Sequence, residues 1–464
     1  MTNESEAPVQ NPDAFIVRKT KSGKNNRIAR CLVLMALAWL LAPPAQAQQN
    51  ASYGHGVAND MLDRVSHDMQ KHYYDPAFHG VDWNAKVRET KKKFQDDKNL
   101  EMSIAHIAAA LDSLNDSHTF LLPPSRSSHH EYGFRTEMDG DRCFIAHTLP
   151  GSDAEAKGVK RGDELLAVNG YRPTRENIWK INYIFRTLRP QPGLTLDLQD
   201  PAGQHRQVAV LAKHKETQQL TDLSSGAADS IIWEMIRQEE YEAHLMRARS
   251  ISVGESLMIL KLPEFDFEAG KVDEFMGRAR KYPALILDLR DNPGGSVETL
   301  KRVLGNLFDK DIKICDRNGR KESKPEIAKT RGDSVFAGKL IVLVNCQSAS
   351  ASELLARVVQ LEKRGQVVGD RSSGSVMAAR HYDYKEGMDT VMFYGASITE
   401  SNLLMGDGKS LEHTGVTPDE TVLPTAADLA SNRDPALSRA AAMLGVKISP
   451  EAAGKLFPFE WPKL

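Results

Sequence analysis

Three continuous apolar runs constrain the fold of this chain most strongly. They are Ser256–Leu262, Ala284–Leu289 and Leu340–Val344, and the third is followed by a helical stretch, Ala351–Leu361. A strand that is apolar on both faces has to be covered on both faces, as in a parallel sheet flanked by helices. Strand-like and helix-like segments alternate from about residue 216 to residue 425. This alternation predicts an α/β core.

Composition and charge exclude several classes of protein. The chain has 464 residues, of which 41% are hydrophobic and 26% charged, so a disordered or fibrous protein is not expected. Lys and Arg number 60 against 62 Asp and Glu, which gives no basic field for nucleic acid. None of the 4 cysteines forms a CxxC pair, and no phosphate-binding glycine loop stands out. We therefore expect no metal, no cofactor and no nucleic-acid partner.

The N-terminus has the pattern of an export signal. Basic residues up to Arg30 precede an apolar stretch, Cys31–Ala42, and an Ala-x-Ala phrase ends at Ala47. The stretch is shorter than the about 20 residues that cross a bilayer. We expect cleavage after Ala47 and a periplasmic or secreted bacterial protein without a stable membrane span. The alternative is an uncleaved membrane anchor.

Two segments precede the α/β core. In the first, Met61, Val65, Met69 and Tyr73 recur at four-residue spacing, which predicts helices. In the second, short β-prone runs alternate with glycines around one helix near Arg175–Leu188.

The phrase Leu149–Gly170 in this second segment resembles the signature stretch of PDZ domains, with Gly158 suited to a helix cap and Asn169-Gly170 to a hairpin turn. Such a domain captures a peptide's C-terminal carboxylate in a nest of backbone N–H groups. By this resemblance the nest falls on Tyr132, Gly133 and Phe134, although the segment departs from the usual glycine-rich form.

A serine-rich junction is the first candidate for chemistry. The strand that ends near Val344 leads through Ser348-Ala-Ser-Ala-Ser352 into a helix. Free N–H groups at a helix N-terminus favour negative charge, so a serine there can act as a nucleophile beside an oxyanion donor. Alternatively, the serines are helix caps and small packing residues.

A second strand ends in a glycine turn. Ala284–Leu289 is followed by Asn292-Pro-Gly-Gly295, a sharp turn with exposed backbone amides. Parallel strands end at the same edge of a sheet, so this turn could supply a second oxyanion donor.

Together these phrases resemble the C-terminal processing (tail-specific) and tricorn-core serine protease family, over about residues 100–420. The resemblance implies a ClpP/crotonase-like β-α sheet, Ser350 as the nucleophile, and oxyanion amides on Ala351 and on Gly294 or Gly295. Tail-specific members use a lysine base 25 residues after the nucleophile. Ser375 occupies that position here, and Lys363 and Lys385 are out of register, so a Ser–Lys dyad is not expected.

The tricorn-core branch uses histidine instead, and its phrases are present. By this resemblance His118 in Asn115-Asp-Ser-His-Thr119 is the general base, Ser117 orients it, and Glu412 before Gly415-Val-Thr-Pro-Asp419 closes the relay. Histidine titrates near neutral pH, and a carboxylate or hydroxyl fixes its tautomer. Asp116 as the partner of His118 and His413 as the base are the alternatives. Cys346 is interpreted as a small buried residue, and His129-His130 as no metal site.

The sequence thus predicts an exported serine endopeptidase that acts on polypeptides, and the resemblance implies that these are held near their C-terminus. Its rivals are a catalytically inactive peptide-binding protein of the same fold and a hydrolase of other esters or amides. The expected organisation is a signal peptide (1–47), a helical segment with the Ser-His pair (48–125), a PDZ-like domain (126–215), a protease core (216–430) and a C-terminal tail (431–464).

Overall fold

The computed structural model describes residues 45–124, 128–216, 246–386 and 392–461. The signal expected at 1–47 lies almost wholly outside the described residues. No helix within the described ranges is both long and apolar enough to cross a membrane. His55–Leu464 forms one compact unit, and the contacts below lie within it.

Helices come first along the described chain. Those before the first sheet are α2 (Ala45–His72), η1 (Phe78–Gly80), α3 (Trp83–Phe94) and α4 (Leu100–Asp112). The Asp82 carboxylate caps α3 and the Asn99 amide caps α4, each by accepting a bond from a first-turn N–H. The predicted stripe from Met61 to Tyr73 is fully buried in one cluster with Ile107 and Leu111 of α4. The helical N-terminal segment is therefore confirmed.

A five-stranded antiparallel sheet follows, in the order β3-β4-β5-β6-β7. Its elements are β3 (Phe134–Asp139), β4 (Arg142–Thr148), α5 (Asp153–Ala156), β5 (Glu164–Val168), α6 (Ile178–Asn182), β6 (Gly193–Gln199) and β7 (His205–Leu211). The two strands that flank this sheet in the sequence, β2 (Ser128–Glu131) before it and β8 (Lys213–Glu216) after it, pair with each other in a short antiparallel ladder. The helix predicted near Arg175–Leu188 is divided into α6 and a π-helical turn, η2 (Tyr183–Leu188). Gly158 and the Asn169-Gly170 pair have positive φ, as their cap and turn positions require.

The core is a six-stranded sheet in the order β18-β15-β14-β11-β10-β9. Its strands are β9 (Arg249–Val253), β10 (Leu257–Lys261), β11 (Ala284–Asp288), β14 (Lys339–Val344), β15 (Gln366–Gly369) and β18 (Glu420–Thr421). All pairings are parallel except that of β9 with β10. The three apolar runs are β10, β11 and β14, which confirms the predicted α/β core.

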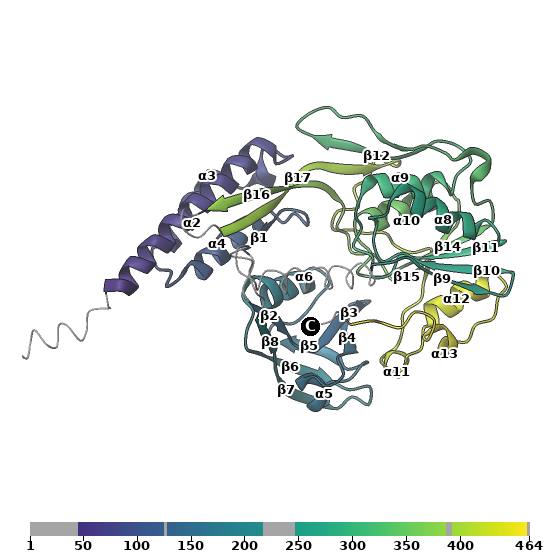
Figure 1. Ribbon diagram of the computed structural model, residues 1–464, viewed down its shortest axis with the longest axis horizontal. Coiled ribbons are helices and arrows are strands. Elements are labelled where there is room, and N and C mark those ends of the chain that lie inside the picture. Colours follow the sequence, from purple (N-terminus) through teal and green to yellow (C-terminus); the bar gives the residue numbers. More distant parts are fainter. Residues whose placement is uncertain (1–44, 125–127, 217–245, 387–391, 462–464) are drawn as a thin grey trace, which may run out of the picture. The chain divides into compact units, whose positions relative to one another are not determined.

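Helices cover both faces of this sheet, which is why its central strands are apolar throughout. Leu285 and Leu287 pack with α8 (Ala269–Ala279), α9 (Val297–Gly305) and α10 (Ala351–Leu361). Ile286 on the same strand packs on the opposite face with α12 (Pro435–Met443) and α13 (Pro450–Ala453). Figure 1 shows these two helical layers, with α8–α10 on one side and α12 and α13 on the other.

A second sheet joins the N-terminal helices to the core. Its order is β1-β17-β12-β13, and β16 also pairs with β17. The strands are β1 (Phe120–Leu122), β12 (Ile312–Gly319), β13 (Glu326–Ala328), β16 (Met377–Glu386) and β17 (Met392–Met405), and the remaining short helices are η3 (Gly332–Ser334) and α11 (Ala426–Ala430). Phe120 of β1 pairs with Ser397 of β17. This pairing fixes His118, which lies two residues before β1, against the far half of the chain.

Candidate active site

Ser350 lies at a sharp turn between β14 and α10. Its backbone has φ +53° and ψ −115°, an unfavourable conformation for a residue with a side chain. The hydroxyls of its neighbours are committed: Ser348 Oγ donates to the Leu289 carbonyl (2.8 Å) and Ser352 Oγ to the Asn292 carbonyl (3.0 Å). Both neighbours are fully buried, whereas Ser350 is partly exposed. Of the three serines, Ser350 alone is presented at the surface of this turn.

The glycine turn after β11 lies directly against Ser350. A Cβ atom on Gly294 would come within 2.7 Å of Ser350 Cβ and 3.0 Å of the Ala351 nitrogen, so only glycine fits this approach. The Gly294 N–H donates to Asn292 Oδ1 at 2.9 Å. The N–H groups of Ala351 and Gly295 donate to no other residue that the structure describes. These two amides are therefore available to an anionic oxygen.

His118 belongs to a hydrogen-bonded chain with Ser117 and Glu412. Ser117 Oγ donates to Glu412 Oε2 (2.9 Å) and lies 2.8 Å from His118 Nδ1. Since a hydroxyl carries one proton, and this one is given to the carboxylate, Nδ1 must donate to Ser117 Oγ. His118 Nε2 is then the basic nitrogen. The Ser117 N–H and the Val376 N–H also donate to Glu412, at 2.9 and 2.8 Å.

The alternative partner, Asp116, and the alternative base, His413, are both bonded to other groups. Asp116 Oδ1 accepts from the backbone N–H of His118 (2.9 Å) and from Thr399 Oγ1 (2.7 Å), so it holds the turn rather than the imidazole ring. The ring of His413 bonds through Nε2 to the Asn115 carbonyl at 3.0 Å. Cys346 Sγ accepts from the Met138 N–H.

Ser375 connects the serine turn to the histidine relay. Its carbonyl accepts from the Ser350 N–H (2.9 Å), and its hydroxyl lies 3.5 Å from His118 Nδ1. No hydrogen bond joins Ser350 directly to His118 among the residues with described positions. The site thus consists of two groups. Ser350 and the two free amides form the first, the hydrogen-bonded relay of His118 forms the second, and Ser375 lies between them.

Glu353 is a residue that the sequence reasoning missed. It is fully buried, and its carboxylate accepts from Ser350 N (3.0 Å) and Ser375 N (3.0 Å) at Oε2, and from Ser372 Oγ (2.6 Å) and Gly374 N (2.7 Å) at Oε1. It therefore fixes the loop 372–375 against the serine turn. A glutamate three residues after a helix-capping serine is the signal that could have identified it.

Two pKa shifts bear on this site. Burial lowers the pKa of His118, although the negative charges of Glu412 and Asp116 oppose the shift. The imidazole is thus neutral, and able to accept a proton, at neutral pH. Burial raises the pKa of Glu353 to about 7, against the effect of its four hydrogen bonds.

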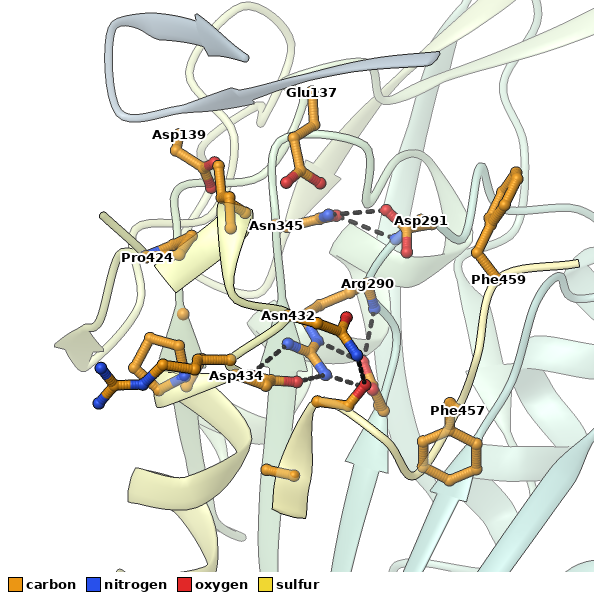
Figure 2. Close-up of a pocket in the computed structure, with 18 of the residues that line it drawn as sticks. Glu137, Asp139, Arg290, Asp291, Asn345, Pro424, Asn432, Asp434, Phe457 and Phe459 are labelled. Atoms are coloured by element: carbon orange, nitrogen blue, oxygen red, sulfur yellow. Dashed lines mark hydrogen bonds and ion pairs between the residues drawn. The ribbon is translucent and has the colours of Figure 1, made fainter. Parts of the chain in front are cut away.

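An ion network around the fully buried Asp288 supports the glycine turn. Arg290 binds Asp288 through Nη2 (2.7 Å) and Asp434 through Nη1 (2.9 Å), and Asn345 donates to Asp291 at 2.8 Å. Figure 2 shows Arg290 with Asp434 and Asn345 with Asp291, in a pocket of about 360 Å³. Despite burial, the charges of Arg290 and Lys261 lower the pKa of Asp288 to about 2. This ionised network holds the end of β11 in place.

A groove lies between the antiparallel sheet and the loop that carries Ser375. A pocket of about 510 Å³ is lined by Thr136 and Met138 of β3, by α6, and by Ser117 and Ser375. A second pocket of about 560 Å³ shares Thr136 with the first and extends along β3 to Arg135 and Arg186. The predicted nest lies at that far end, where Tyr132 is fully buried.

Comparisons with known proteins agree with this architecture. Residues 256–422 match the profile of peptidase family S41, and residues 122–178 match that of the PDZ domain. The chain is 25% identical to carboxyl-terminal-processing peptidase 1, chloroplastic, of Arabidopsis thaliana, over 72% of this chain and 67% of the relative. It is 23% identical to the carboxyl-terminal-processing protease of a Picosynechococcus strain, over 84% and 88%. The crystal structure of mature CPAF has a similar fold, with a TM-score of 0.61 at 17% identity over 82% of this chain and 94% of that one.

Proposed function

Because the chain carries a peptidase family S41 core and a PDZ domain, we propose that it is a serine endopeptidase that cuts exported polypeptides through an acyl-enzyme. The observation that carries the proposal is the chain of contacts from Glu412 through Ser117 to His118 Nδ1. The bonds from Ser117 to Glu412 and from His118 to Ser117 leave Nε2 as an acceptor. A serine nucleophile needs such a base because its hydroxyl is weakly nucleophilic at neutral pH.

The reaction proceeds in two halves. Ser350 Oγ attacks the carbonyl carbon of a peptide bond while its proton passes to His118 Nε2. The N–H groups of Ala351 and Gly295 stabilise the oxyanion, and Glu412 stabilises the imidazolium through Ser117. His118 then protonates the leaving amine. In the second half, water attacks the acyl-enzyme with His118 as base, which releases the carboxylate product and restores Ser350.

Direct proton transfer requires Ser350 Oγ and His118 Nε2 to come within hydrogen-bond distance when substrate binds. Catalytic hydrogen bonds are often long in the absence of substrate and shorten in the complex. Ser375 is placed to transmit such a movement, since its carbonyl accepts from the Ser350 N–H and its hydroxyl lies 3.5 Å from His118 Nδ1.

The export signal at 1–47 and the domain boundaries given above are part of the proposal. Cleavage after Ala47 would release a chain that meets polypeptides outside the cytoplasm.

An inactive peptide-binding protein of the same fold is the second candidate. It is favoured by Ser375 at the position of the family lysine and by the missing bond between Ser350 and His118. It predicts peptide binding without turnover.

The two candidates separate in a cleavage assay. Residues 48–464 are incubated with reduced, unfolded casein, and the fragments are identified by mass spectrometry. The endopeptidase should produce internal fragments, with rates reduced by at least about 10³ in Ser350→Ala and His118→Ala. Ser113→Ala is the matched control, because Ser113 is an exposed serine whose hydroxyl bonds to the Ala110 carbonyl, away from the relay. Intact casein with the wild-type chain would favour the binding protein.

A further inference from the structure

The nest expected to hold a substrate carboxylate is already occupied by a carboxylate of the chain itself. Glu131 precedes the phrase Tyr132-Gly133-Phe134, and its side chain folds back over it. Glu131 Oε1 accepts from the Gly133 N–H at 2.8 Å. The same carboxylate forms a bidentate pair with Arg135, at 2.7 and 2.6 Å, and lies 3.8 Å from Arg186. Its side chain is 3% exposed.

Glu131 thereby makes bonds of the kind that a terminal carboxylate would make, one with the Gly133 N–H and two with a guanidinium. An incoming carboxylate seeks a backbone N–H and a guanidinium, and here both are taken. Although burial opposes it, the hydrogen bonds and charge of Arg135 hold the pKa of Glu131 below its ordinary value, so the group is ionised. A second carboxylate at this site would meet like charge at short range in a poorly solvated place.

The adjoining edge of β3 is also partly occupied. The Phe134 carbonyl accepts from Arg186 Nη2 (2.8 Å) and Arg135 Nη1 (3.0 Å). The Trp461 ring lies over the Arg135 guanidinium, with the centroid at 4.7 Å. The groove remains open further along, at Thr136, which lines both pockets between Arg186 and Ser375. A peptide can therefore enter beside Thr136 without ending at the nest.

We propose that Glu131 replaces the substrate carboxylate, so that the PDZ domain accepts internal polypeptide segments and does not select free C-termini. This inference deepens the proposed function, since it names the substrate class, and it rests on that function only for cleavage. Peptide binding is therefore measured in a Ser350→Ala chain, where the loss of proteolysis cannot affect the result.

The probe is a pool of octapeptides with randomised residues and an apolar last residue, made both as free acids and as carboxamides. Retention on the immobilised Ser350→Ala chain is quantified by mass spectrometry. Free acids and carboxamides should be retained to the same extent, within about threefold. Adding Glu131→Gln, which keeps the shape and removes the charge, should raise retention of the free acids by about tenfold and leave the carboxamides unchanged.

Glu164→Gln is the matched control, because Glu164 pairs with Arg142 on the same sheet but away from the nest. Glu164→Gln should change the retention of neither the free acids nor the carboxamides. A preference of the Ser350→Ala chain for free acids beyond about threefold would overturn the proposal. So would the absence of any gain in Glu131→Gln. If Glu131→Gln does not fold, as judged by near-ultraviolet circular dichroism, the comparison of acids with carboxamides in the Ser350→Ala chain decides alone.

Discussion

Replacing Glu353 by glutamine should release the loop that connects the two halves of the site. All four contacts of the Glu353 carboxylate are donors directed at it. If the glutamine NH2 group takes the Oε2 position, it faces the Ser350 and Ser375 N–H groups; if it takes the Oε1 position, it faces the Gly374 N–H, while the Ser372 hydroxyl can turn and accept from it. At least one hydrogen bond to a charged group is therefore lost, at a cost of about 1.5–3 kcal/mol.

The assay combines unfolding in urea at pH 8 with the rate of peptide cleavage. At that pH the wild-type carboxylate is ionised, because its pKa is about 7. Cleavage should fall on the order of 10² or more, because displacement of catalytic groups by about 1 Å has such effects. Glu362 lies at the end of the same helix and forms a partly exposed ion pair with Lys310, so Glu362→Gln should change the free energy of unfolding and the cleavage rate little. A Glu353→Gln chain within about 1 kcal/mol of wild type, with full activity, would refute the reasoning.

Three further outcomes are expected. Protonation of Glu353 below its pKa of about 7 loosens the loop, so activity should decline as pH falls through that value. Ser372→Ala removes a hydrogen bond that lowers the pKa of Glu353, so this variant should show the decline at higher pH. A kcat/KM profile that Ser372→Ala does not move would count against the assignment. Ser117→Ala should reduce kcat on the order of 10², since it disconnects the Glu412 carboxylate from His118. Ser113→Ala in the preceding turn should leave kcat unchanged, and equal kcat values for the two variants would contradict the relay. Arg290→Met removes the guanidinium that pairs with the fully buried Asp288 and leaves only Lys261, at 3.9 Å, near that carboxylate. The free energy of unfolding in urea titrations should fall by about 3–5 kcal/mol, so a change under 1 kcal/mol would be inconsistent with the network.

The core was predictable because its signals are local. An apolar run such as Ala284–Leu289 can only be a strand buried on both faces or a helix, and the Asn-Pro-Gly-Gly turn after it decides for the strand. The stripe from Met61 to Tyr73 has the helical period, and its side chains are buried as that period requires. Each signal lies within 13 consecutive residues of the sequence.

The rest depends on contacts between distant segments. Thr119 Oγ1 bonds to Thr399 Oγ1 across 280 positions, and this contact helps to position His118. The role of Glu353 emerges only when the loop 372–375 folds back over the start of α10. The occupation of the nest by Glu131 depends on a side-chain direction that no spacing encodes. The roles of Ser350, His118 and Glu412 therefore remain predictions until they are tested chemically.

The most direct test of the central claim is covalent labelling with a fluorophosphonate probe. Residues 48–464 are treated at pH 8, and the labelled peptide is identified by mass spectrometry. The account predicts a single label on Ser350, absent in Ser350→Ala and strongly slowed in His118→Ala. A folded wild-type chain that takes no label, or one labelled equally fast without His118, would contradict it.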